Sequence, residues 1–199
     1  TAFLHHTADL TGARSVSRQR AERAVELDPL DPFVNFAMGR TFWLEGDLES
    51  SLPWLERATS ISPNYAQGLY ARSWTECLAG RSLEARELVD SAMQLSPLDP
   101  LYYAMVGTRA FSHIALGEDA EAADWAERAA RSPGAHVLIA MIAVVAHGLA
   151  GHEELGAHWA ANVRSRNPAL TRDDFFHAFP MRVEATRSRV SQALERRGF

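Results

Sequence analysis

The chain has 199 residues, of which 47% are hydrophobic and 23% charged, a balance typical of a folded, soluble protein rather than a disordered one. Its net charge is -5 and all 20 basic residues are arginine, so it lacks the excess of positive charge typical of nucleic-acid binders, and we expect no direct nucleic-acid partner. Cys77 is the only cysteine, which excludes a disulfide framework and favours a cytoplasmic protein.

A hexapeptide near the start of the chain returns almost unchanged further on. LDPLDP at residues 27–32 is followed by LSPLDP at residues 95–100, which begins 68 residues later, or twice 34. Prolines that follow helical stretches keep nearly the same step of 34 to 36 residues. Proline ends a helix because it lacks the amide hydrogen and clashes with the preceding turn, so this spacing indicates a repeated helical unit. These prolines are Pro29, Pro63, Pro97, Pro133 and Pro168.

Other residue types recur in step with these prolines. A glycine, the residue preferred just after a helix, lies 16 or 17 residues before four of them: Gly46, Gly80, Gly117 and Gly151. Five residues after each glycine comes a small residue: Ser51, Ala85, Ala122 and Gly156. Eight residues after each comes a bulky one: Trp54, Leu88, Trp125 and Trp159. The pattern predicts pairs of closely packed antiparallel helices.

In chain order, we expect helices over residues 2–11, 14–28, 32–45, 48–61, 66–79, 82–95, 101–116, 119–131, 135–150 and 153–166, and then over 171–179 and 183–197. Asp31 and Asp99 are expected to cap two of these helices, each with a proline at the first helical position. The stretch YYAMVGTRAFSHIALG predicts a longer first helix than in the other pairs. The apolar run at residues 136–151 is too short to span a bilayer and predicts a buried helix.

From about residue 14 to residue 168, this pattern resembles the tetratricopeptide repeat (TPR) family. The resemblance implies an all-α, right-handed α-solenoid, with about 4.5 repeats in residues 1–168 and capping helices in residues 169–199. The tail also resembles the end of TPR regions in bacterial cyclases and winged-helix regulators, on the Phe179–Pro180 pair and Gly198. That resemblance implies a regulatory or dimerisation region of a larger signalling protein, whose output domain would lie outside this sequence.

Polar clusters give little support for catalysis. His147, His152 and His158 have spacings that are loose for a zinc site, although the first and last could face each other across a helical hairpin. Cys77 lies among apolar residues, with no base placed beside it. We therefore expect no enzymatic activity, no cofactor and no metal, with small-ligand or metal sensing as a remote alternative. The acidic residues of one helix are expected to form a solvated face: Glu118, Asp119, Glu121, Asp124 and Glu127.

The concave face of the solenoid is the candidate binding surface. In TPR arrays the first helix of each pair lines this face. The inward positions of these helices here carry aromatic residues and one arginine, which predicts an aromatic groove with one guanidinium. Gln67 lies at another of these inward positions. For any single residue of this groove, packing between helices is the competing interpretation. Aromatic residues and arginine dominate binding hot spots, so we expect a protein or peptide partner. The predicted groove residues are Phe33, Phe36, Arg40, Trp43, Tyr70, Trp74 and Phe111. A clamp for a terminal carboxylate of the kind that uses lysine is not expected, because the chain has none.

Self-association as a dimer is a further expectation. The array has an apolar beginning, around Phe3, Leu4 and Leu10, and exposed apolar ends favour a partner. No membrane association is expected.

Overall fold

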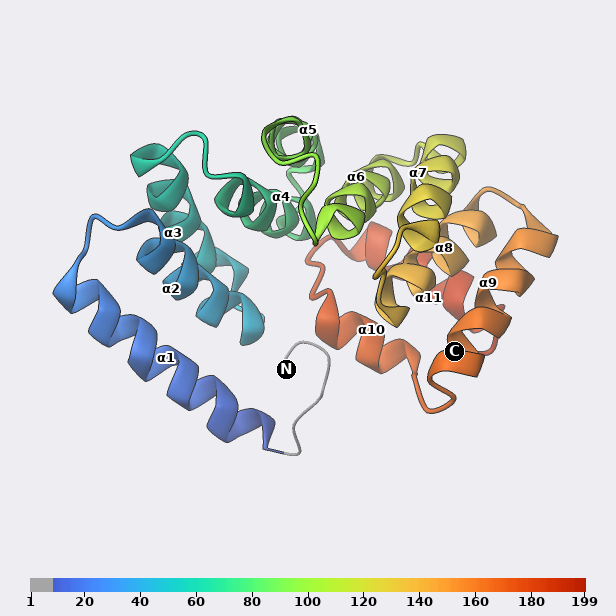
Figure 1. Ribbon diagram of the computed structural model, residues 1–199. Coiled ribbons are helices and arrows are strands. Elements are labelled where there is room, and N and C mark those ends of the chain that lie inside the picture. The colour runs from blue at the N-terminus through green and yellow to red at the C-terminus, as the bar shows by residue number, and fades with distance from the viewer. Residues whose placement is uncertain (1–8) are drawn as a thin grey trace.

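The computed structural model describes residues 9–199, and within them every regular element is a helix (Figure 1). The helices are α1 (Leu10–Leu27), α2 (Pro32–Leu44), α3 (Leu48–Ile61), α4 (Ala66–Ala79), α5 (Ser82–Leu95), α6 (Tyr102–Leu116), α7 (Asp119–Arg131), α8 (Val137–Leu149), α9 (Glu153–Arg166), α10 (Arg172–Ala178) and α11 (Glu184–Glu195). The predicted all-α architecture is confirmed. Phe3 and Leu4 lie outside the described residues.

Helices α2 to α9 form four antiparallel pairs arranged as an arch, with α1 at one end and α10 across the open side (Figure 1). Each helix packs on its neighbours in sequence, and the inner helices α2, α4, α6 and α8 also contact one another in turn. Helix α6 has 15 residues, more than any other inner helix, as its sequence predicts. Helix α8 is buried along almost its whole length, as the apolar run predicts.

The predicted boundaries of the first helices are wrong. The sequence predicts a break between residues 11 and 14, but α1 runs through this region without interruption. The Asp9 carboxylate accepts a hydrogen bond from the backbone N–H of Gly12 at 2.8 Å, so the helix starts at Leu10. The glycine at position 12 therefore lies in the first turn rather than ending a helix.

The turns within the pairs follow the predicted glycines. The backbone φ of Gly46, Gly80, Gly117 and Gly151 lies between 74° and 101°, a region that favours glycine. Of the two hexapeptide copies, only the first has the predicted aspartate cap in the turn between pairs. Asp31 caps α2 through the N–H of Val34.

The predicted cap by Asp99 is wrong, because α6 begins only at Tyr102. The Asp99 carboxylate instead accepts hydrogen bonds from the side chain of Gln67 at 2.7 Å and from Ser96 at 3.2 Å. It therefore ties α4 to the turn that precedes α6.

Small residues bring the two helices of a pair together. The Ser51 hydroxyl donates to the carbonyl of Gly39 at 2.8 Å, and a side chain at position 39 would overlap Leu55. One repeat later the Ser73 hydroxyl donates to the carbonyl of Ala85 at 2.7 Å. In each of these two buried helix contacts the serine hydroxyl has a hydrogen-bond partner, which explains why a polar residue is tolerated there.

The tail does not lie over the last repeat alone. Residues 180–197, called the clasp below, run along the turns within all four pairs. Arg182 donates from its backbone to the carbonyl of Leu78 at 2.9 Å and from its side chain to the carbonyl of Gly46 at 2.7 Å. Arg189 binds the carbonyl of Ile114 at 3.0 Å and Asp119 at 2.6 Å.

The other end of the clasp contacts the last pair. Arg196 donates to the carbonyl of Gly148 at 3.3 Å, and Arg197 pairs with Glu153 at 2.7 Å. Within α11, Val190 and Leu194 are fully buried, and α11 packs on α8. The clasp thus combines an apolar contact with arginines that bind carbonyls near the ends of the inner helices and in the turns that follow them.

The acidic helix α7 differs from the expected solvated face. The Glu127 carboxylate accepts from His147 at 2.9 Å and also from the Trp159 indole N–H. Glu118 binds Arg86 and His113, and Asp119 binds the clasp. Three of the five acids therefore link neighbouring elements, because the adjacent helices present donors to them.

Candidate binding groove

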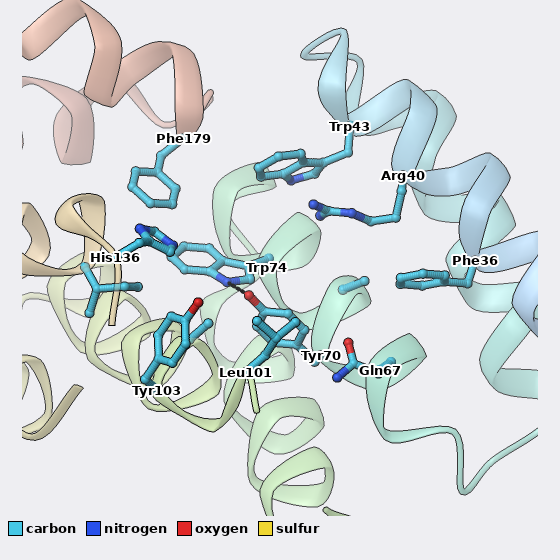
Figure 2. Close-up of a pocket in the computed structure, with 13 residues that line it drawn as sticks. Phe36, Arg40, Trp43, Gln67, Tyr70, Trp74, Leu101, Tyr103, His136 and Phe179 are labelled. Carbon is cyan, nitrogen blue, oxygen red and sulfur yellow. Dashed lines mark hydrogen bonds between the residues drawn. The ribbon is translucent and has the colours of Figure 1, made fainter. Parts of the chain in front are cut away.

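A cavity of about 240 Å³ opens on the concave side of the arch, between the inner helices and the tail (Figure 2). Its walls come from α2, α4, the start of α6, the start of α8 and the segment after α10. The lining residues are Phe36, Arg40, Trp43, Gln67, Tyr70, Ala71, Trp74, Leu101, Tyr103, Ala104, His136, Ile139 and Phe179. Called the groove below, this cavity is largely aromatic and contains no carboxylate.

Five of the seven predicted residues line the groove: Phe36, Arg40, Trp43, Tyr70 and Trp74. Phe33 does not, since it lies at the outer end of α2 with 62% of its surface exposed. Phe111 does not either, since it is fully buried and lines a smaller cavity beneath the tail.

Phe111 occupies the same repeat position as Arg40 and Trp74, six residues before a turn glycine, which is why the pattern places it in the groove. The tail changes its surroundings, because the ring of Phe179 lies 6.0 Å from the ring of Phe111 and covers it. Phe179 itself is missed by the sequence pattern, since no local signal relates the tail to the concave face.

Leu101, Tyr103, His136 and Ile139 are missed for a different reason. They lie at the beginning of α6 or α8, or just before it, and in these two helices the prediction names only Phe111. A search over the whole inner face of each first helix would have included Tyr103 and Ile139.

Trp74 is the centre of the aromatic wall. Its ring stacks on Phe179, with centroids 5.0 Å apart and planes at 20°, and contacts Phe111 at 5.5 Å. Its indole N–H donates to the Tyr70 hydroxyl at 3.1 Å. Trp43 and Trp74 are only 4% and 3% exposed, so these rings support the fold while presenting one face to the groove.

Among residues 9–199, Arg40 is the only formally charged side chain in the groove lining at neutral pH. Figure 2 shows its guanidinium pointing from α2 into the cavity, alongside Trp43, whose ring centroid lies 4.1 Å from the Cζ atom. Among the described residues no carboxylate pairs with it. Arg40 is partly buried, and this burial lowers the pKa of its guanidinium.

The other titratable groups of the groove are neutral. Burial raises the pKa of Tyr70 to about 12 and also raises the pKa of Tyr103. Burial, helped by the nearby Arg166, lowers the pKa of His136 to about 4. At pH 7 the described residues of the groove therefore offer one positive charge and neutral phenol groups on apolar walls.

The histidine cluster does not converge on one point. His147 Nδ1 lies 3.2 Å from His152 Nδ1, while its Nε2 binds Glu127 on the other side of the ring. His158 is exposed and packs edge-on against Trp159 rather than facing His147. No group of three metal-ligating side chains is found within residues 9–199.

The single thiol is buried, as its apolar neighbours predict. Burial raises the pKa of Cys77 to about 12, and its Sγ lies 3.9 Å from the Ser82 hydroxyl. In the part of the chain that the structure describes, no helix is both long and apolar enough to cross a bilayer.

Comparison with known proteins identifies the fold. No family model matches the chain, and neither does any curated protein. Among solved structures, the chain is similar to PilW, described as a widely conserved type IV pilus biogenesis factor, with a TM-score of 0.69, 16% identity, and coverage of 92% of this chain and 93% of PilW. It is also similar to TTC0263, described as a thermophilic TPR protein of Thermus thermophilus, with a TM-score of 0.68, 18% identity and 92% coverage of both chains.

A third similar structure is YrrB, described as a TPR protein with an unusual peptide-binding site. Its TM-score is 0.57 at 13% identity, with 89% of this chain and 90% of YrrB covered. The chain therefore has the fold of a TPR solenoid. At these identities the similarity defines the fold alone.

Proposed function

We propose that the protein is a non-catalytic interaction module that binds a peptide segment of a partner in the groove. One observation carries this proposal: a concave cavity with aromatic walls and a single guanidinium, in a fold used for protein interaction. Rigid aromatic side chains and arginine provide much of the binding energy at protein interfaces. The similarity to YrrB adds support, because that TPR protein has a peptide-binding site.

Capture of peptides from a random hexapeptide library by the purified protein tests this proposal. Phe36 and Tyr103 are suitable positions for variants because both line the groove and both are only partly buried. Phe36→Ala and Tyr103→Ala are expected to fold and to weaken capture about tenfold or more, as for hot-spot residues. Leu98→Ala is the control, since Leu98 is 94% exposed and lies outside the groove. Capture that depends on none of the groove residues contradicts the proposal.

The second candidate is a regulatory segment of a larger signalling protein. It is favoured by the Phe179–Pro180 pair, which joins the groove to the clasp and would transmit movement of either one. A clasp variant outside the groove lining, Arg189→Gln, that alters the activity of an attached output domain without affecting peptide capture supports this candidate over the first.

A further inference from the structure

We propose that the groove selects an acidic peptide: a segment that presents one carboxylate to Arg40 and an apolar or aromatic side chain to the rings around Trp74. This inference rests on the proposed function and specifies the chemistry of the ligand.

The charge of the groove is the first argument. The chain as a whole is acidic, with a net charge of -5, yet Arg40 is the only charged residue that the described part of the chain contributes to the groove lining. No aspartate or glutamate belongs to that lining. An anion therefore meets attraction at this site and no like charge.

The surroundings of Arg40 are the second argument. Its guanidinium contacts the face of Trp43 and has no ion pair within the described residues. Most other arginines within the array pair with a carboxylate or a backbone carbonyl; Arg72, for example, contacts Glu76 and Glu84. A partly buried guanidinium with unused donors is stabilised when a carboxylate binds it, since such charge-assisted hydrogen bonds are roughly twice as strong as neutral ones.

Tyr70 provides a second donor beside this charge. Its hydroxyl accepts the indole N–H of Trp74, which leaves its own hydrogen free to donate. Because its pKa is raised to about 12, the group remains a neutral phenol and does not repel an anion. Arg40 and Tyr70 line the same cavity, so both can contact one ligand.

The apolar part of the ligand is indicated by the chain itself. Phe179 from the tail stacks on Trp74 at 5.0 Å, so this wall already accepts an aromatic ring. The cavity of about 240 Å³ that remains has room for further side chains between Phe36 on one wall and Tyr103 on the other. A peptide with an apolar residue next to its acid fits both features.

The test is a hexapeptide library made in two forms, with a free C-terminal carboxylate and with a C-terminal amide. The wild-type protein is expected to select peptides with a carboxylate, and replacing the selected Asp or Glu by Asn or Gln should weaken binding about tenfold or more. If the acid comes from a side chain, the amide form binds equally well. If it comes from the terminus, only the free acid binds.

Variants assign the preference to Arg40. Arg40→Gln should bind the peptide with the carboxylate and the peptide with an amide in its place equally well. Arg20→Gln makes the same change of charge at an exposed site on α1, and it should retain the preference for the carboxylate. Arg40→Lys should retain part of it, because the charge stays while the planar contact with Trp43 is lost. If Arg40→Gln does not fold, NMR of the wild-type protein gives the answer. The Nε–Hε signal of Arg40 is assigned as the one that is missing from the spectrum of Arg40→Lys. This signal should shift when the acidic peptide is added, and should not shift with the same peptide in which the carboxylate is replaced by an amide.

Two results would overturn the inference. Selection of neutral peptides that depends on Phe36 and Tyr103 contradicts the carboxylate preference but leaves the binding groove in place. Capture that is unaffected by every groove variant contradicts both the inference and the proposed function.

Discussion

The contact between Phe179 and Trp74 should couple the tail to the middle of the array, and a double-mutant cycle measures that coupling. Phe179→Leu and Trp74→Leu each remove an aromatic ring but keep an apolar side chain. The two rings are stacked with centroids 5.0 Å apart, and both residues are nearly fully buried. Each single variant should lose about 1–3 kcal/mol of unfolding free energy, less than the ~3–5 kcal/mol expected for truncation to Ala.

The coupling energy follows from the geometry of the pair. Aromatic pairs at this separation contribute about 0.5–1.5 kcal/mol beyond the area that they bury. The double variant should therefore be more stable than the sum of the two single losses predicts, by about 1 kcal/mol. Urea unfolding followed by far-ultraviolet circular dichroism is the suitable assay, because Trp74→Leu changes the fluorescence signal itself.

A cycle of Trp74→Leu with Leu98→Ala is the control, since Leu98 is 94% exposed and should show no coupling. If the Phe179 and Trp74 losses simply add, within about 0.3 kcal/mol, then Phe179 is not seated on Trp74 and the tail does not form a wall of the groove.

Three other predictions use different groups of the protein. Cys77, whose pKa is raised to about 12 by burial, should resist thiol reagents at pH 8 in the folded protein and react in urea; rapid reaction without urea contradicts its burial. His136 has a pKa near 4 when folded, so the unfolded chain takes up its proton first as pH falls from about 6.5 to 4, and stability should fall by up to about 3 kcal/mol in that window. His136→Gln should flatten this pH dependence, and an imidazole pKa near 6.5 by NMR contradicts it. Finally, we expect a dimer at tens of micromolar by light scattering, and a strictly monomeric mass would count against it.

Much of the fold could be predicted because its signals are local. A glycine with positive φ ends the first helix of every pair, and a proline follows the second, so helix ends are marked in the sequence itself. Asp31 and Asp99 show the limit of local signals. The two lie in nearly identical hexapeptides, yet only Asp31 caps a helix, while the carboxylate of Asp99 binds Gln67 from the preceding repeat and the backbone N–H of Leu101.

Groove residues could be predicted from the sequence only where the position in the repeat alone determines whether the side chain reaches the cavity. Tyr70 and Trp74 follow the pattern of the first helices and reach the cavity. Phe111 follows the same pattern but is covered by Phe179, a residue 68 positions later in the chain. The contacts of the clasp could likewise not be predicted, because arginines that lie off the apolar stripe of a helix are expected to be solvent-exposed. Arg189 instead binds a helix-ending carbonyl and Asp119.

The tail gives the proposed ligand a means of acting on the whole array. A peptide held between Arg40 on α2 and Phe179 would contact the first full pair and the tail together. The tail in turn binds turns that lie far apart in sequence, from the carbonyl of Gly46 to the carboxylate of Glu153. Binding and closure of the clasp are then linked, and linkage is reciprocal: the free energy by which a closed clasp favours the peptide equals the free energy by which the peptide favours the closed clasp. A peptide that contacts both walls of the groove would therefore stabilise the contacts of the clasp with the turns of all four pairs, whereas in an array without the clasp it would stabilise only neighbouring repeats.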